Sequence, residues 1–320
     1  MKIVFMGTPE FAIPSLKKLL SSSHKIEAVV SAPDKERGRG RQVTFTPVKQ
    51  FALENNLKVF TPVDLKSTEF IDEMKKINPD LFVVVAFRIL PKELFLLPRY
   101  GSINLHASLL PKYRGAAPIQ WALINGDKET GVTTFFLEEK VDTGNIILQE
   151  KIDIDDNDDF GSLHDRLMNL GADVVLKTVD LIEKGLAKVS KQDNSLTSPA
   201  PKITKEICEI DFNKSAHEIH NLVRALSPYP GAFFYHNGKN VKIFKTRVVT
   251  EDSINKNNWQ SIEINLSNGK TSVINISQTK KEIFIRTKEK VLQIIELQPE
   301  GRKKITAEEF LRGYKFPINY

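Results

Sequence analysis

The chain has 320 residues, 41% hydrophobic and 27% charged, with a net charge of +6, an ordinary composition for a globular protein long enough for two domains. No apolar run approaches the roughly 18–20 residues of a membrane-spanning helix, and neither a signal peptide nor a transit peptide is evident. The single cysteine, Cys208, excludes an intrachain disulfide and a cysteine-cluster metal site, so we expect a cytoplasmic protein without membrane attachment.

The first 107 residues alternate short apolar runs with helical patterns. Strands are predicted at 2–6, 26–31, 59–60, 81–87 and 103–107, and helices at 11–20, 47–54, 68–77 and 92–97. Thr8 is the expected N-cap of the first helix, with Pro9 at its first position. This alternation predicts a doubly wound, mostly parallel, Rossmann-like sheet. The Gly-x-Gly-x-x-Gly fingerprint and the Walker A sequence are both missing from the sequence, which disfavours a dinucleotide-dependent oxidoreductase.

Residues 32–42 form a segment too long and too glycine-rich for a simple connection between a strand and a helix. It contains Arg37, Arg39 and Arg41, alternating with Gly38 and Gly40. Alternating arginines on a flexible backbone are suited to phosphates or to stacking on bases, whereas an exposed loop with incidental charge is the simpler alternative.

Two polar residues share one face of the strand predicted at 103–107. Asn104 and His106 alternate with Ile103, Leu105 and Ala107, so both point to the same side. A lone histidine is most often a buried group bonded to the backbone. Here an amide, an imidazole, a turn at Leu110-Pro111 and a basic loop follow within a few residues, at the strand end where α/β sheets build their sites.

The next segment is predicted to contribute a carboxylate. A helix at 118–124 precedes strands at 131–137 and 146–152, and the polar turn between these strands contains Asp142. If the hairpin lies beside the strand of His106, Asp142 would orient the imidazole. An amide, an imidazole and an acid suit stabilisation of an oxyanion on a carbonyl carbon while an attacking amine loses its proton. A metal site is not expected, because His106 has no second histidine at ligand spacing.

The last third of the chain has a different pattern. After a helix at 162–184, a polar linker leads to a helix at 215–226, six short strands about ten residues apart, and a terminal helix at 307–311. The spacing predicts a small all-β barrel of the oligonucleotide-binding (OB) type. Residues 205–320 hold 19 basic and 13 acidic side chains, which is the whole excess of +6 and favours a polyanionic partner. We expect a catalytic domain at 1–188, a linker at 189–206 and the barrel domain at 207–320.

One extended motif resembles the signature of the folate-dependent formyltransferases. It reads Asn104-x-His106-x-Ser108-Leu109-Leu110-Pro111-x-x-Arg114-Gly115-x-x-Pro118-Ile119-Gln120, followed by Asp142-Thr143-Gly144. Four further features are similar to family members that act on methionyl-tRNA. They are the opening Phe5-x-Gly7-Thr8-Pro9-Glu10-Phe11, the arginine segment, the motif Arg224-Ala225-Leu226-x-Pro228-x-Pro230-Gly231 and the basic barrel. The resemblance covers nearly the whole chain.

The resemblance implies a reaction and three catalytic roles. The formyl group of 10-formyltetrahydrofolate would pass to the α-amino group of methionine on initiator tRNA, releasing tetrahydrofolate, in a monomer that needs no metal. By similarity, Asn104 would hydrogen-bond the formyl oxygen. His106 would stabilise the oxyanion and help to move the proton. Asp142 would hold His106 and accept the amine proton through water.

The resemblance also implies the binding surfaces. The folate site would be lined by Ser108, Leu109, Leu110 and Pro111, with the pterin pocket formed by the Asp142 turn and by Phe87, Arg88, Ile89 and Leu90. The loop around Arg39 would enter the acceptor stem of the tRNA, and the barrel would hold its backbone. In one departure from many relatives, the segment before Ile89-Leu90-Pro91 is one residue shorter, lacks a tyrosine and a glycine, and places Arg88 beside the folate pocket.

Two alternatives stay open at this stage. A folate-dependent formyltransferase acting on a ribonucleotide amine or an amino sugar would use the same catalytic residues, but a small substrate needs neither a basic barrel nor an arginine loop. A non-catalytic tRNA-binding protein would not need Asn104, His106 and Asp142 together.

Overall fold

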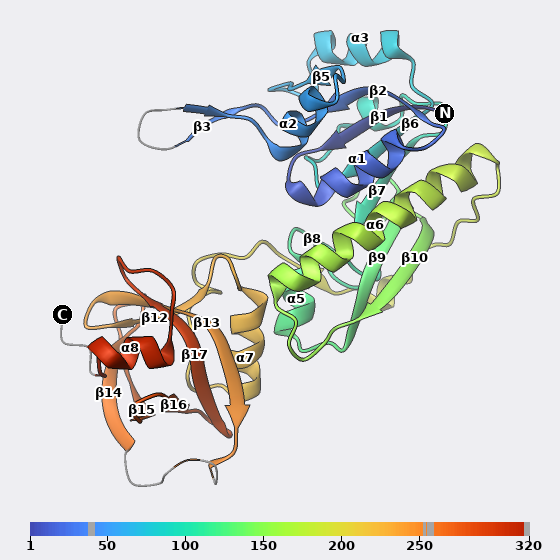
Figure 1. Ribbon diagram of the computed structural model, residues 1–320. Coiled ribbons are helices and arrows are strands. Elements are labelled where there is room, and N and C mark those ends of the chain that lie inside the picture. The colour runs from blue at the N-terminus through green and yellow to red at the C-terminus, as the bar shows by residue number, and fades with distance from the viewer. Residues whose placement is uncertain (38–41, 252–253, 255–258, 317–320) are drawn as a thin grey trace. The chain divides into compact units, whose positions relative to one another are not determined.

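Seven strands in the order β10-β9-β7-β6-β1-β2-β5 form the central sheet of the N-terminal part of the chain (Figure 1). The structure is a computed structural model that describes residues 1–37, 42–251, 254 and 259–316. The sheet consists of β1 (Lys2–Gly7), β2 (Lys25–Val30), β5 (Val59–Phe60), β6 (Leu81–Val85), β7 (Ser102–His106), β9 (Glu129–Phe136) and β10 (Ile146–Asp153). The first five run parallel, β9 pairs antiparallel with β7, and β10 pairs antiparallel with β9. The predicted, mostly parallel sheet is confirmed.

Helices connect the strands of this sheet or follow its last strand, β10. They are η1 (Glu10–Ala12), α1 (Ile13–Leu20), α2 (Pro47–Glu54), α3 (Thr68–Ile77), α4 (Lys92–Phe95), α5 (Pro118–Ile124), α6 (Phe160–Glu183) and η2 (Asn194–Leu196). The prediction of Thr8 as an N-cap is wrong. The chain first makes the 3-10 turn η1 after Pro9, and α1 begins only at Ile13, with Ala12 at its N-cap position.

The carboxyl ends of β6 and β7 lie side by side. Val84 pairs with Asn104 and Val85 with Leu105, and all five residues of β6 are buried, as its continuous apolar run predicted. On the other side of β7, His106 pairs with Thr133 of β9. These registers bring the end of β7 between a parallel and an antiparallel neighbour, and the polar residues of β7 lie at that end.

Two short ribbons accompany the sheet. β3 (Lys35–Arg37) pairs antiparallel with β4 (Gln42–Thr44), and Figure 1 shows this ribbon projecting away from the sheet. β8 (Arg114–Gly115) pairs parallel with β11 (Pro199–Ala200). The second ribbon joins the segment after β7 to residues that were predicted to be a linker.

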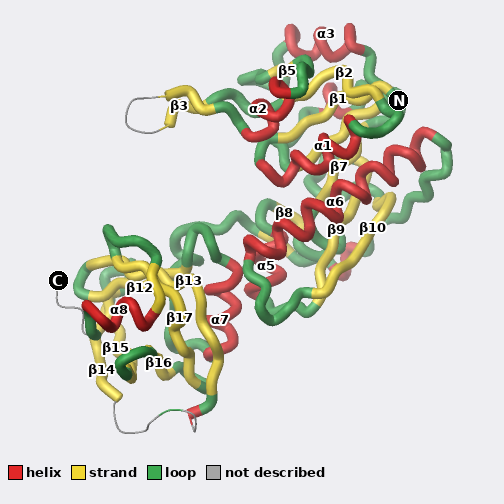
Figure 2. Tube along the Cα trace, in the orientation of Figure 1, coloured by secondary structure: helices red, strands yellow, loops and turns green. Residues whose placement is uncertain are grey.

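A closed barrel forms the C-terminal part of the chain (Figure 2). Its elements are α7 (Ala216–Ala225), β12 (Ala232–His236), β13 (Lys239–Val249), β14 (Trp259–Asn265), β15 (Thr271–Gln278), β16 (Ile283–Arg286), β17 (Val291–Pro299), β18 (Ile305–Thr306) and α8 (Ala307–Gly313). Pairing of β13 with β17 closes the strand order, as expected for an OB-type barrel. The interior is rich in isoleucine, and both helices begin with capping boxes, at Ser215 and Thr306.

The chain packs as two units that interleave along the sequence. The first comprises Met1–Pro118, Glu129–Asp153 and His164–Pro201, and the second comprises Ile119–Lys128, Ile154–Leu163 and Lys202–Tyr320. The domain limits proposed from the sequence stay a prediction. Within the described ranges, no helix combines the length and apolar character that crossing a bilayer requires.

Candidate active site

Strand β7 presents Asn104 and His106 on one face, as the alternation predicted. Asn104 is half-buried and His106 is 6% exposed. No described residue forms a hydrogen bond with the Asn104 amide, whereas the His106 ring is held in place. Asn104 therefore offers an amide donor whose hydrogen bond is available to a ligand.

The backbone after β7 sets the tautomer of His106. Its Nε2 lies 2.8 Å from the carbonyl oxygen of Tyr113. A carbonyl oxygen only accepts, so Nε2–H donates and carries a proton. Tyr113 itself is 6% exposed and has a φ of 61°, a left-handed conformation that is costly for a non-glycine residue and is typical of functional sites. The remaining ring nitrogen, Nδ1, is the atom that faces Asp142.

Asp142 comes from the turn between β9 and β10 and lies beside His106, as expected. Its Oδ2 is 3.9 Å from His106 Nδ1, too long for a direct hydrogen bond. The same oxygen accepts a hydrogen bond of 2.9 Å from the backbone N–H of Gly115. Asp142 is 9% exposed and has a φ of 56°. The carboxylate is thus fixed by the backbone, within electrostatic range of the imidazole.

Gly144 shapes the turn that carries Asp142. A Cβ atom at this position would lie 1.7 Å from the carbonyl oxygen of Phe136, a separation that no side chain tolerates. The turn therefore needs a glycine for close approach of two backbones, in addition to the acid that precedes it by two residues.

Residues of the predicted linker hold the site together, and the sequence reasoning missed them. Gln192 Nε2 donates to the carbonyl oxygens of Asp142 (2.9 Å) and Gly144 (2.8 Å), and its Oε1 accepts from Arg114 Nε (3.0 Å). The Ser198 hydroxyl accepts a hydrogen bond of 2.9 Å from the Tyr113 N–H. These contacts bridge segments up to 85 residues apart through backbone groups, so no local pattern marks them. Only the structure shows that a polar side chain lies opposite the carbonyl oxygens of the turn that carries Asp142.

The turn Ser108–Pro111 is braced internally. The Thr133 hydroxyl donates to the Ser108 carbonyl (2.6 Å) and accepts from the Leu110 N–H (3.1 Å), and Gln149 Nε2 donates to the Leu110 carbonyl (2.9 Å). The side chains of Ser108 and Leu110 are buried, whereas Leu109 and Pro111 are half-buried. Contact of this turn with folate stays a prediction, for which Leu109 and Pro111 are the accessible members.

The second predicted folate wall, Phe87–Leu90, follows β6. Leu90 is buried, Phe87 is half-buried and Ile89 is 74% exposed. Arg88 directs its guanidinium to the carbonyl oxygens of Pro62 and Val63. Burial lowers the pKa of Arg88 from its usual value, and the nearby Asp64 opposes that shift.

The arginine segment is only partly described. Arg37 is the last residue of β3, and its backbone pairs with Gln42. Arg39 and Arg41 lie outside the described residues. The segment was expected to be a loop, but strand pairing extends into it from both ends. Its role in binding tRNA stays a prediction.

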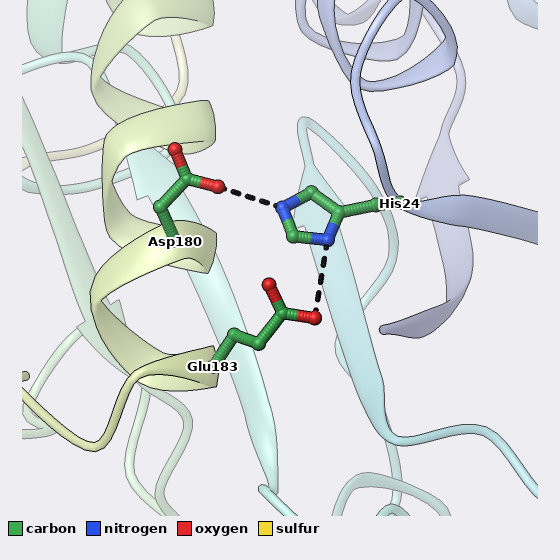
Figure 3. A group of neighbouring side chains, drawn as sticks. All are labelled: His24, Asp180 and Glu183. Carbon is green, nitrogen blue, oxygen red and sulfur yellow. Dashed lines mark hydrogen bonds and ion pairs between the residues drawn. The ribbon is translucent and has the colours of Figure 1, made fainter.

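A buried histidine between two carboxylates forms a separate polar cluster in the same unit (Figure 3). The ring of His24 has Asp180 Oδ1 at 2.8 Å from Nε2 and Glu183 Oε1 at 3.8 Å from Nδ1. Figure 3 shows that the two acids, both from α6, approach opposite ring nitrogens. A metal ion would use one ring nitrogen with both acids on its side, so this arrangement is better described as a clamp between α6 and the start of β2.

Comparisons with known proteins agree with this geometry. Residues 1–179 match the family described as Formyl transferase, and residues 202–315 match Formyl transferase, C-terminal domain. The methionyl-tRNA formyltransferase of Caldanaerobacter subterraneus subsp. tengcongensis is 44% identical over 319 residues, covering 99% of this chain and 98% of its own. That of Clostridioides difficile is 44% identical over 314 residues, covering 98% and 97%.

Solved structures show the same fold at lower identity. An N-formyltransferase from Helicobacter canadensis, in complex with folinic acid and dTDP-3-aminofucose, aligns with a TM-score of 0.66 at 24% identity, covering 95% of this chain and all of its own. HypX from Aquifex aeolicus, in complex with tetrahydrofolic acid, aligns with a TM-score of 0.60 at 17% identity, covering 98% of this chain and 48% of its own.

Proposed function

The chain belongs to the formyl transferase family, and we propose that Asn104, His106 and Asp142 carry out the transfer that its methionyl-tRNA relatives perform. The enzyme transfers the formyl group of 10-formyltetrahydrofolate to the α-amino group of methionine on initiator tRNA. The observation that supports the three residues is their placement. Asn104 and His106 share one face at the end of β7, and Asp142 lies 3.9 Å from the ring nitrogen that the backbone leaves available.

The methionine nitrogen bonds to the formyl carbon of bound 10-formyltetrahydrofolate as the bond between that carbon and the folate nitrogen N10 breaks. The amine loses one proton and N10 gains one, so tetrahydrofolate leaves neutral at N10. The amide of Asn104 donates a hydrogen bond to the formyl oxygen, where negative charge develops. The ring of His106, which the Nε2–H bond to the Tyr113 carbonyl oxygen holds in place, stabilises the same charge and helps to move the proton.

Asp142 is the third member of the site, and its role is to accept the proton of the amine. Its carboxylate faces Nδ1 of His106 across 3.9 Å, and it accepts the proton of the attacking amine through a water bound beside it. The N–H of Gly115 holds the carboxylate, and Gln192 holds the backbone of the same turn.

The folate co-substrate fits the accessible groups. The flat faces of the folate rings suit the exposed Ile89 and the half-buried Leu109 and Pro111, and the amide of Asn104, which no described residue bonds, matches a carbonyl-type oxygen. Contacts of the other predicted wall residues belong to the same proposal.

We further propose that Arg37, Arg39, Arg41 and the basic barrel at 207–320 bind the tRNA, and that the enzyme acts as a cytoplasmic monomer. The excess of +6 at 205–320 supports a polyanionic substrate over a small amine. The catalytic residues alone do not distinguish a tRNA substrate from a small amine.

A formylation assay tests the proposed function. Purified protein is supplied with 10-formyltetrahydrofolate and charged initiator tRNA, and in parallel with charged elongator tRNA or an amino sugar. We expect N-formylmethionyl-tRNA from the initiator alone. Transfer to the amino sugar in preference to the tRNA would favour the small-amine alternative, and absence of any transfer would reject the proposal.

A further inference from the structure

The segment Ala86–Leu90, which connects β6 to α4, is anchored on both sides of one exposed residue. Ala86 has a φ of 47°, which turns the chain sharply as it leaves the sheet. Phe87 packs against a core cluster that also contains Leu90, which is 6% exposed. Between these anchors, Ile89 is 74% exposed.

Arg88 provides the anchor immediately before Ile89. Its Nη1 donates to the carbonyl oxygen of Val63 at 3.0 Å and its Nη2 to that of Pro62 at 2.6 Å. The guanidinium also lies over the ring of Phe87, 5.3 Å from the centroid. A planar guanidinium can bridge two successive carbonyls, whereas the single ammonium of a lysine cannot match both.

The position of Arg88 has a cost. Its Nε is buried, and the described residues offer it no acceptor. Nη1 and Nη2 each use one N–H on the carbonyl oxygens of Val63 and Pro62, so the direction of the guanidinium is fixed from the protein side. Direct contact of Arg88 with folate stays a prediction.

Ile89 is held outward as a result. A single exposed isoleucine is ordinary on a protein surface, so its exposure alone implies nothing. Here Arg88 and Leu90 are both fixed, and turning Ile89 inward would release one of them. The segment also leaves the sheet directly after Val85, which pairs with Leu105, the residue between Asn104 and His106. Ile89 is thus presented from the strand next to the reacting residues.

We propose that Arg88 is a positioning residue for folate. It acts through Ile89: the two hydrogen bonds to the 62–63 carbonyls hold the isoleucine outward as an apolar contact for the ring system of the co-substrate. This inference rests on the proposed function, because it takes folate as the ligand of this wall.

The test compares Arg88→Met, Arg88→Lys, Ile89→Ala and the double variant Arg88→Met/Ile89→Ala. Binding of 5-formyltetrahydrofolate, a folate that is not turned over, is measured by calorimetry, together with KM and kcat for 10-formyltetrahydrofolate. We expect Arg88→Met to raise Kd and KM roughly tenfold, equivalent to about 1.4 kcal/mol, with kcat within about twofold. Arg88→Lys should be intermediate, because one donor remains.

The double variant separates positioning from general damage. If Arg88 acts through Ile89, adding Arg88→Met to Ile89→Ala should weaken binding no further, whereas independent effects would multiply and overturn the proposal. Arg99→Met is the matched control, since Arg99 is exposed and stacks on Tyr100 at 5.0 Å. Its folate affinity should equal that of the wild type. Unchanged affinity in both Arg88 variants would also overturn the inference, and failure of the wild type to bind folate would overturn the proposed function itself.

Discussion

At the scale of single residues, Asn104 has the amide that makes no hydrogen bond to the described part of the protein. We expect Asn104→Ala to lower kcat by about 10²–10³, the usual effect of losing one oxyanion donor, with folate and tRNA affinity largely kept. Single-turnover formylation measures the chemical step, and calorimetry measures the affinities. A variant that formylates at a near wild-type rate would remove Asn104 from the mechanism.

Gly144 is a second residue on which the site depends. It takes no part in the reaction, and its importance is that it has no side chain where two backbone segments approach closely. In Gly144→Ala the new Cβ would lie 1.7 Å from the Phe136 carbonyl oxygen, so the turn with Asp142 must move. A displacement of about 1 Å near reacting groups can cost roughly 10²-fold in rate, and we expect a loss of that size in kcat.

The control for this substitution is Gly313→Ala. A Cβ at Gly313 meets nothing within 4 Å, so this variant should keep wild-type activity and thermal stability. If Gly144→Ala were as active as Gly313→Ala, the turn would be more tolerant than its geometry indicates.

These residues also show how far the sequence reasoning could reach. Alternation along β7 placed Asn104 and His106 on one face because side-chain direction in a strand is a local property. The approach of Asp142 was also expected, since a hairpin that follows the strand often lies beside it. Gln192 was out of reach, because it acts on the backbone carbonyls of Asp142 and Gly144 about 50 residues away, and any polar side chain in a linker looks alike.

At the scale of elements, local features were likewise predictable from the sequence, and long-range contacts were not. Helices α2 and α3 have side-chain caps at Thr46 and Ser67 and were predicted with their observed limits. The start of α1 was missed because the turn η1 intervenes. The close approach of Gly7 to this turn, where a Cβ at position 7 would lie 2.8 Å from that of Ala12, is a contact that the sequence does not show. The strands of the barrel followed from turn spacing, but its closure by β13 and β17 is a long-range pairing.

Helix α7 contains a histidine that makes the C-terminal unit sensitive to acid. Burial, reinforced by Arg224, lowers the pKa of His220 from 6.5 to about 4. The unfolded chain therefore binds a proton near pH 6.5 that the folded chain accepts only near pH 4. This stability is present above about pH 6.5 and is lost as the pH falls to about 4, by on the order of 3 kcal/mol.

Urea unfolding at pH 7 and pH 5 measures this effect. His220→Gln should lose less stability between the two values than the wild type. His217→Gln changes an exposed histidine of the same helix that contributes less to the lowered pKa of His220 than burial or Arg224, so this variant should keep most of the wild-type difference. Equal pH dependence in the His220 variant and the wild type would show that other groups govern the acid response.

At the scale of the whole molecule, charge and chemistry are placed in different parts of the chain. The excess of +6 lies entirely within 205–320, whereas Asn104, His106 and Asp142 belong to the N-terminal sheet. A tRNA held by phosphate contacts should show an affinity that falls steeply with salt, because each contact releases counterions.

The arginine segment should contribute measurably to that slope. Replacing Arg37, Arg39 and Arg41 together by alanine should reduce the slope of log affinity against log salt by about 2–3, with affinity for 5-formyltetrahydrofolate unchanged. Fluorescence titrations at several salt concentrations give the slope. A parallel loss of folate affinity would mean that the segment supports the folate site instead.

The hydrogen bonds of Gln192 and Ser198 show that the candidate site depends on residues beyond the last strand of the sheet. A fragment cut after residue 188 would retain every strand of the sheet and all three proposed catalytic residues, yet it would lack the side chains that hold the Asp142 turn and Tyr113. Limited proteolysis on the N-terminal side of Gln192 should therefore abolish folate-dependent turnover, while cleavage after Pro201 should spare folate binding. The segment that leads to the barrel is, by this measure, also the last structural part of the proposed catalytic site.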